Sequence, residues 1–276
     1  MASGLGDVVG TVSKALGLLD QFSRQRALIG LSDFARASGM NKATCHRMLT
    51  ELAAHGFVEQ VGAAREYRLG PQALRLAALR EAAVPMREAA QPVLRALAQE
   101  LGETVHLSVI VGENLKMLAY AYSATHAMTV MMEDADTLPW HATSSGLAVL
   151  AFGPQALARR VLAQPLLRLT AQTETDPDAI RARLAVVQAQ GFAESASGFE
   201  EGVHSLAAPL FDAGATCCGA LALAAPAARM GPELRSRVQS SLITAAQQIT
   251  TLWGGQVPPA IADIWQGTPL PTQERA

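Results

Sequence analysis

Residues 41–55 combine basic, hydroxyl and apolar side chains at helical spacing. Asn41 is the expected N-cap of a helix that runs to about His55. The buried stripe of this helix recurs at i, i+3, i+4 and i+7, and consists of Cys45, Met48, Leu49 and Leu52. The opposite face carries side chains that can address a phosphate or a base edge, namely Lys42, Ala43, Thr44, His46, Arg47 and Thr50. A solvated helix face would also explain Lys42 and Arg47 taken singly.

The residues before this helix predict a partner helix and a sharp turn. Ser32 can cap a short helix that carries Phe34 and Ala35 inward, and Gly39 supplies the freedom to end it. A small residue at 35, Gly four residues later and apolar Cys45 ten residues later are typical of a helix-turn-helix over residues 31–50. An earlier helix is expected at about 13–22, capped by Ser13. The second helix of a helix-turn-helix enters the DNA major groove.

A predicted hairpin follows, with strands at 57–61 and 66–69, and resembles the wing of a winged helix. Arg65 and Arg68 on it could straddle a phosphate backbone, although wing arginines are also common as solubilising charge. Pro71 suits the first turn of a linker helix over 71–84. Aromatic residues are sparse here, which argues against a single-strand or RNA-stacking surface. We therefore expect 1–70 to bind double-stranded DNA.

Charge and composition agree with this division. Residues 1–80 hold ten Lys/Arg and six Asp/Glu, a net of +4, whereas 81–276 hold twelve and eighteen, a net of −6. A basic front end on an acidic body suits a DNA-reading module joined to a different domain. The three cysteines give no disulfide framework. With no signal peptide and no membrane-length apolar run, we expect a cytoplasmic protein.

The remainder predicts an α+β domain, in which helices cover an antiparallel sheet. Helices are expected at 85–101, 145–152, 177–190 and 232–252, and strands at 105–111, 115–122, 128–132, 203–211 and 217–224. Residues 254–276, rich in Pro, Gly and Gln, are expected to form a loosely ordered tail. The domains are thus 1–70, the 71–84 linker, 85–253 and the tail.

Several tracts, in order over about residues 10–253, make the chain similar to the IclR family of transcriptional regulators. They include Lys42-Ala43-Thr44-Cys45-His46-Arg47-Met48-Leu49, Tyr67-Arg68-Leu69-Gly70, Gly102-Glu103-Thr104-Val105-His106-Leu107, His141-Ala142-Thr143-Ser144-Ser145-Gly146 and Gly202-Val203-His204-Ser205-Leu206-Ala207-Ala208-Pro209. The resemblance implies a winged-helix homodimer, usually assembled into a homotetramer. It also implies that 85–253 is a GAF-like domain that binds a small metabolite, often an organic or aromatic acid.

The resemblance also implies where the effector binds. In the family it lies between the loop before the central helix and the late strands. By position these supply Ser144 and Ser145, whose N–H groups would meet a carboxylate, and Ser195, Ser205, Ala222 and Ala224. Many relatives carry an acid where Ser195 stands, and some carry Cys at 205 and serines on the last strand. This pocket is therefore less polar, and Met128, Met131 and Met132 could add an adaptable apolar wall.

The residues support three alternative interpretations less well: a metal site, a hydrolase and an adaptor without DNA binding. His106, His141 and His204 with Cys217 or Cys218 lack the spacing of a metal site. Ala142–Gly146 superficially resembles a nucleophile elbow, but a hydrolase would need a positioned His and Asp and a doubly wound sheet. An adaptor that has lost DNA binding is disfavoured by Lys42, Arg47, Arg65 and Arg68.

The sequence thus predicts a non-enzymatic, DNA-binding transcriptional regulator, without metal or cofactor, controlled by a small effector with a carboxylate or hydroxyl on an apolar or aromatic body. Whether it represses or activates, its operator, and dimer versus tetramer are left open.

Overall fold

The computed structural model describes residues 10–23, 26–83, 85–132 and 137–267, and the chain forms two compact units, 1–85 and 86–276. Each unit has its own hydrophobic core. Within the described part of the chain, none of the helices combines the length and apolar character needed to cross a bilayer.

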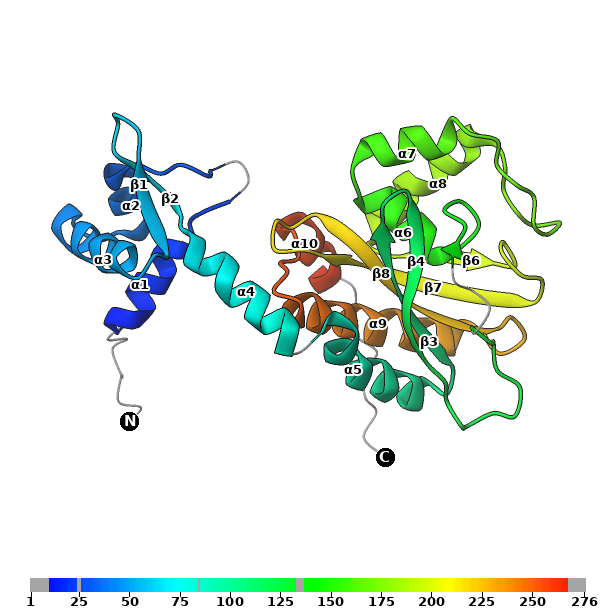
Figure 1. The fold of residues 1–276 in the computed structure, drawn as a ribbon. Coiled ribbons are helices and arrows are strands. Elements are labelled where there is room, and N and C mark those ends of the chain that lie inside the picture. The colour runs from blue at the N-terminus through cyan, green and yellow to red at the C-terminus, as the bar shows by residue number, and fades with distance from the viewer. Residues whose placement is uncertain (1–9, 24–25, 84, 133–136, 268–276) are drawn as a thin grey trace, which may run out of the picture. The chain divides into compact units, whose positions relative to one another are not determined.

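The N-terminal unit packs three helices against a hairpin, and a fourth helix follows (Figure 1). Its elements are α1 (Thr11–Leu19), α2 (Leu31–Ser38), α3 (Lys42–Ala54), β1 (Val58–Val61), β2 (Glu66–Leu69) and α4 (Pro71–Ala83). Phe34 is fully buried between the edges of Phe22 and Tyr67, with ring centroids 5.5 and 6.1 Å away. This aromatic cluster fixes α2 against the hairpin and so sets the position of α3, which packs on α2.

Helix ends in this unit match the sequence in part. The Asn41 side chain accepts a hydrogen bond from Thr44 N–H at 2.8 Å, which confirms the predicted cap of α3. Gly39 ends α2 with φ 68°, a left-handed conformation that favours glycine. The predicted caps Ser13 and Ser32 were wrong, because α1 and α2 begin after Gly10 and Gly30 with no side-chain cap. Leu52 is only half-buried, unlike Cys45.

The C-terminal unit is built on one antiparallel sheet with strand order β5-β4-β3-β8-β7-β6. Its strands are β3 (Thr104–Val111), β4 (Asn114–Ala121), β5 (Thr137–Leu138), β6 (Ala193–Ala196), β7 (Val203–Phe211) and β8 (Cys217–Pro226). Its helices are α5 (Met86–Leu101), α6 (Ser144–Phe152), α7 (Gln155–Leu162), α8 (Pro177–Gln190), α9 (Pro232–Leu252) and α10 (Pro259–Gly267). The order of elements is the predicted α+β arrangement.

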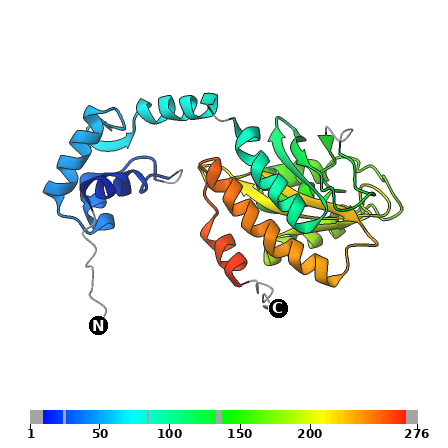
Figure 2. The ribbon, with the colours of Figure 1, turned by 90° about the horizontal axis from the view of Figure 1, so that it is seen from below.

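Helices cover both faces of this sheet. α5 and α9 run side by side along one face, as Figure 2 shows, and contact β3, β4, β7 and β8. α6 packs on the other face against β7, β8 and β6, with α7 and α8 outside it (Figure 1). All residues of α6 except its last, Phe152, are buried, which explains why it reads as a continuous apolar run.

Residues 128–132 do not form the strand that the sequence predicted. Two side chains hold this segment in place of a backbone ladder: Thr104 Oγ1 donates to Val130 O at 2.8 Å, and Tyr122 Oη accepts from Met132 N–H at 2.8 Å. Val130 and Met132 are buried and pack with Ala224. The alternating burial of this segment, a pattern that predicts a strand, here comes from side-chain hydrogen bonds and packing without strand pairing.

The described part of the predicted tail is ordered. α10 packs back on the unit through Trp265, whose indole N–H donates to Gly191 O at 2.8 Å and whose ring lies 6.3 Å from that of Phe211. Gly191 has φ 81° and no room for a side chain, since an added Cβ would lie 2.7 Å from the Trp265 ring. The expectation of a loose tail was therefore wrong up to residue 267, and residues 268–276 lie outside the described residues. The short elements α7, β5 and β6 were not anticipated.

Candidate functional site

The predicted nucleic-acid face of α3 lies opposite the helix's buried stripe. Lys42, Ala43, His46, Arg47 and Thr50 are exposed and Thr44 is half-buried, whereas Cys45, Met48 and Leu49 are buried in the core. Thr50 Oγ1 donates to His46 O within the helix at 2.9 Å. Packing thus leaves the basic and polar residues accessible together, on a helix held in place by its other side.

The hairpin carries the two predicted wing arginines in different surroundings. Arg65 lies in the turn with φ 54°, and its Nε donates to Gln60 Oε1 at 3.3 Å while Gln60 Nε2 donates to Arg65 O at 2.8 Å. Arg68 lies directly across the strands from Glu59 and forms an ion pair with it. Arg68 would therefore have to share its guanidinium between Glu59 and a phosphate, whereas Arg65 has no acidic partner among the described residues.

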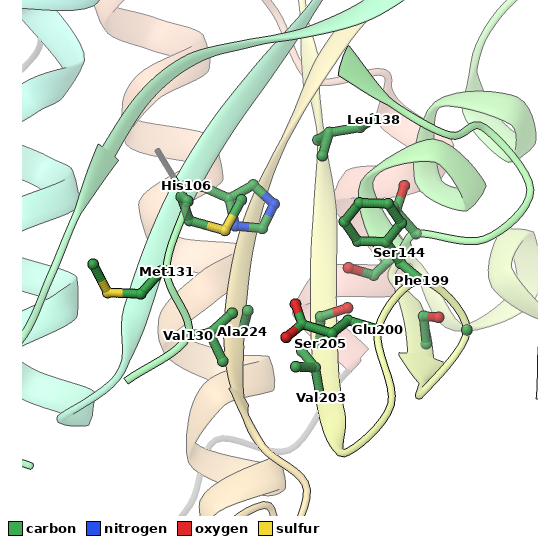
Figure 3. A pocket seen from close by; sticks show the side chains of 14 residues that line it. His106, Val130, Met131, Leu138, Ser144, Phe199, Glu200, Val203, Ser205 and Ala224 are labelled. Atoms are coloured by element: carbon green, nitrogen blue, oxygen red, sulfur yellow. The ribbon is translucent and has the colours of Figure 1, made fainter. Parts of the chain in front are cut away.

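A pocket opens in the C-terminal unit on the sheet face that α6 covers (Figure 3). Its empty volume is about 490 Å³, partly open to solvent. Strands, the start of α6, segment 130–132 and the loop after β6 all contribute to its wall. The lining residues are His106, Val130, Met131, Met132, Leu138, Thr143, Ser144, Ser195, Gly198, Phe199, Glu200, Val203, Ser205 and Ala224.

The floor of the pocket is a row of short side chains. Ser205 lies across from Ala224 on one side and from Ser195 on the other, so the three occupy one line across β8, β7 and β6. Because side chains at paired positions lie on the same face of a sheet, these small groups leave space that larger ones would fill. The hollow is therefore encoded by Ser and Ala at these paired positions.

His106 is a buried polar group of the wall, 5% exposed. Its Nε2 lies 3.3 Å from Ser145 Oγ, and its Nδ1 is buried with no hydrogen-bond partner in the part of the chain that the structure describes. Burial lowers the pKa of His106 from 6.5 to about 4, so the ring is neutral near pH 7. Buried N–H groups without a partner are rarer than buried acceptors without one, which favours a hydrogen on Nε2 and a free lone pair on Nδ1.

The start of α6 presents backbone donors at the pocket. The Thr143 side chain caps the helix by accepting from Gly146 N–H at 3.0 Å and itself donates to Pro139 O at 2.9 Å. The N–H groups of Ser144 and Ser145 come before it and have no partner inside the helix. A helix N-terminus of this kind favours an anionic or strongly polar group.

The loop after β6 is held rigidly beside the pocket. Thr170 Oγ1 donates to Ser197 O at 2.6 Å, and Thr173 Oγ1 donates to Gly198 O at 2.7 Å. Ser195 Oγ donates to Ala142 O at 2.8 Å, and an added Cβ at Gly198 would lie 2.6 Å from that same oxygen. These contacts, which we call the threonine clamp after Thr170 and Thr173, fix where the following residues, Phe199 and Glu200, lie.

Five of the eight residues predicted to bind an effector line this pocket. They are Met131, Ser144, Ser195, Ser205 and Ala224.

The other three predicted residues do not line it. Met128 is 70% exposed, and only its carbonyl is engaged, by Arg229 at 2.9 Å. The Ser145 side chain bonds His106 instead, and Ala222 lies one row farther along the sheet, opposite His106 and fully buried.

The prediction missed several lining residues, chiefly His106, Thr143, Phe199, Glu200 and Val203. His106 had a readable signal, because Thr104, His106 and Ser108 alternate with apolar residues along β3 and all three are buried. Buried polar side chains on one face of a strand indicate a polar site on that face. Phe199 and Glu200 lie on an irregular loop and had no such signal.

The alternative chemistries find no support in the described residues. No group of three His, Cys, Asp or Glu side chains there could hold a metal ion. Ser144 has no hydrogen-bonded histidine, and the one beside Ser145 has no carboxylate on its Nδ1 to orient it. Burial raises the pKa of Cys217 to about 12 and that of Cys218 to about 11, which leaves both as unreactive thiols.

Two family models match the chain. The IclR helix-turn-helix domain matches residues 11–62, and the C-terminal domain of the bacterial transcriptional regulator IclR matches residues 80–251. The HTH-type transcriptional regulator BhcR of Paracoccus denitrificans (strain Pd 1222) is 29% identical over 241 residues, 87% of this chain and 85% of that protein. The transcriptional repressor IclR of Escherichia coli (strain K12) is 25% identical over 249 residues, 90% of this chain and 91% of that protein.

Solved structures of IclR-type proteins are also similar to this chain. The crystal structure of an IclR-type transcriptional regulator from Silicibacter sp. TM1040 is 52% identical, with a TM-score of 0.80, and covers 91% of this chain and 99% of that one. An IclR homolog from Microbacterium hydrocarbonoxydans, solved in complex with 4-hydroxybenzoate, is 28% identical with a TM-score of 0.53, over 88% of this chain and 99% of that one.

Proposed function

The chain belongs to the IclR family of DNA-binding transcriptional regulators with a C-terminal effector-binding domain, and on this premise we propose how it works. A small effector binds in the pocket between α6 and the row Ser195, Ser205 and Ala224. Binding changes the affinity of the α3 face for a specific operator sequence. The observation that carries this proposal is the buried, unpartnered Nδ1 of His106, since a native pocket rarely leaves such a group unsatisfied unless a ligand or water completes it.

The effector that suits this pocket has a polar end and an apolar or aromatic body. The Ser144 N–H at the start of α6 would bind a carboxylate or hydroxyl, and Met131, Phe199 and Val203 would contact the body. The complex of the Microbacterium hydrocarbonoxydans homolog with 4-hydroxybenzoate, an aromatic acid, supports this class.

DNA contact is proposed for Lys42, Ala43, Thr44, His46, Arg47 and Thr50 on α3 and for Arg65 and Arg68 on the hairpin. The α3 residues would address the major groove and the hairpin arginines the flanking phosphates. Since the operator of a bacterial regulator lies in the cytoplasm, the protein would act there.

We propose that the protein acts as a homodimer or homotetramer. Helix α4 exposes Leu74 (76%), Leu76 and Leu79, and α1 exposes Val12 (72%) and Leu16. Apolar side chains this numerous on two helices of one unit suit burial against a second copy. The effector would then act by shifting the spacing of two winged helices through α4.

A thermal-shift screen of small carboxylic and aromatic acids tests the pocket. A true effector raises the unfolding temperature by mass action, and Ser205→Phe, which fills the floor, abolishes the shift. Ser236→Phe, at an exposed position of α9, is the control and keeps it. If every compound that stabilises the native protein stabilises the Ser205→Phe variant equally, the pocket is not the effector site.

A further inference from the structure

The pocket carries a negative side chain, which disfavours binding of a ligand whose only charge is a carboxylate. Among the lining residues Glu200 is the one acidic side chain, and no lysine or arginine lines the wall. The Glu200 carboxylate has no ion pair or hydrogen bond among the described residues. Figure 3 shows its side chain directed inward, among the other lining side chains, rather than away from the pocket.

Contacts of the preceding loop residues fix the position of Glu200 at the pocket. Thr170 and Thr173 hold the carbonyls of Ser197 and Gly198, and Gly198 lies against Ala142 O with no space for a side chain. Ser197 itself has φ 52°, a conformation that a non-glycine residue rarely adopts. A backbone fixed this closely two residues earlier delivers Glu200 to the pocket instead of leaving it in a free loop.

The neutral polar groups of the pocket also suit a hydrogen-bond donor. Neutral His106 offers a lone pair on Nδ1, and Ser144 and Ser205 add hydroxyls to the same wall. A ligand carrying only a carboxylate would place a second negative charge in the same pocket as Glu200. The N-terminus of α6 offsets about half an elementary charge, which leaves that repulsion incompletely balanced.

We infer that the effector carries its own positive charge: it is a zwitterion, with a carboxylate at the start of α6, a protonated or quaternary amine beside Glu200, and a compact apolar body. This inference rests on the proposed function and narrows its ligand class. The ammonium group pairs with the Glu200 carboxylate, the ligand carboxylate meets the Ser144 N–H, and Met131 and Phe199 cover the rest. Such a ligand has no net charge, and its ammonium group pairs with the one acidic side chain of a pocket that has no lysine or arginine.

Calorimetry on the full-length protein with matched compounds tests this. One series is phenylalanine, 3-phenylpropanoate and 2-phenylethylamine; the second is leucine, 4-methylpentanoate and 3-methylbutylamine; the third is 4-aminobutanoate, butanoate and propylamine. Each compares a zwitterion with the same body lacking the amine or the carboxylate. We expect a zwitterion to bind at least about fivefold more tightly than its acid, the size expected of a partly exposed ion pair.

Glu200→Gln is the decisive variant, because it removes the charge and keeps the size. It should abolish the preference for the zwitterion and improve binding of the acid, while the melting temperature stays within about 2 °C of that of the native protein, as is usual for surface substitutions. Glu201→Gln, the exposed neighbour that does not line the pocket, is the matched control and should change neither.

The possible failures are distinguishable. If acids bind as tightly as zwitterions, or if Glu200→Gln leaves the preference unchanged, the inference is wrong and the proposed effector pocket stands. If acids bind and no zwitterion does, the inference is again wrong. If no compound of any charge binds in these series or in the acid screen, the proposed function fails with it.

Discussion

His106 couples the stability of the C-terminal unit to pH. Its pKa is about 4 in the folded protein and 6.5 when exposed, so between these values the unfolded chain binds more protons. Stability therefore falls as pH drops from about 6.5 towards 4, by up to about 3 kcal/mol, and changes no further from this group below pH 4. Urea unfolding at pH 7 and pH 5 measures this loss.

His106→Gln isolates that effect, since the amide can still donate to Ser145 and does not titrate. The difference in unfolding free energy between pH 7 and pH 5 should be smaller in this variant than in the native protein. An equal pH dependence in both proteins would mean that the folded-state ring is not held neutral. The same variant should weaken effector binding if Nδ1 meets the ligand.

Thr173 is a second residue whose effect can be measured. Its buried hydroxyl donates to Gly198 O and accepts from Leu169 N–H and Thr170 N–H at 3.0 and 2.8 Å. Thr173→Val leaves these groups unpaired, which should cost about 1–3 kcal/mol of stability and loosen the loop that carries Glu200. Chemical denaturation measures the loss of stability, and calorimetry measures the effect of the looser loop on effector affinity.

Thr244→Val is the matched control for the threonine clamp, because Thr244 is exposed on α9 and bonds only within its own helix. It should change stability by less than about 0.5 kcal/mol. If the two variants have equal stability and equal effector affinity, the clamp does not hold the pocket.

At the scale of elements, substitutions on α3 test the proposed DNA contact most directly. Arg47→Ala should weaken operator binding by about 1–3 kcal/mol if the side chain reads a base, and lower the salt slope by about 1 if it contacts a phosphate. Fluorescence anisotropy with a duplex that the protein selects from a random pool measures both. Arg181→Ala on α8, exposed and far along the chain, is the control, and equal losses in both variants would remove the case for α3.

Elements governed by local rules were predictable from the sequence. The turn at Gly39, the cap at Asn41 and the hairpin around Arg65 depend on residues within a few positions of one another, and the structure has all three. α10 was missed because it depends on Trp265 reaching Gly191, 74 residues earlier in the chain. Segment 128–132 was misassigned for the same reason, since a distant Thr104 and a tyrosine hydroxyl hold it.

The residues of the pocket also fall into those that the sequence could place and those that it could not. Ser195, Ser205 and Ala224 could be placed together because strand pairing puts them in one row. Glu200 and Phe199 could not, because their position depends on hydrogen bonds from Thr170 and Thr173 to a loop without regular structure. The polarity of the floor was thus predictable, whereas the charge of the rim was not.

At the scale of the whole molecule, self-association links the two proposed activities. Leu76→Glu together with Leu79→Glu places two charges one turn apart on α4 and should shift the protein to a smaller species in sedimentation velocity, with weaker operator binding. Leu167→Glu, at a residue 68% exposed in the C-terminal unit, is the control and should change neither. If the α4 variant sediments as the native protein does, these leucines are not part of an interface between copies.

Ligand control of DNA binding is the central claim, and one titration tests it most directly. The affinity of the native protein for its selected duplex is measured by anisotropy with and without a saturating compound from the calorimetric series. We predict a change of at least about fivefold, in either direction, that disappears in the Ser205→Phe variant. Identical affinities with and without a bound ligand would contradict the account, because a ligand that does not distinguish two states of the protein cannot control it.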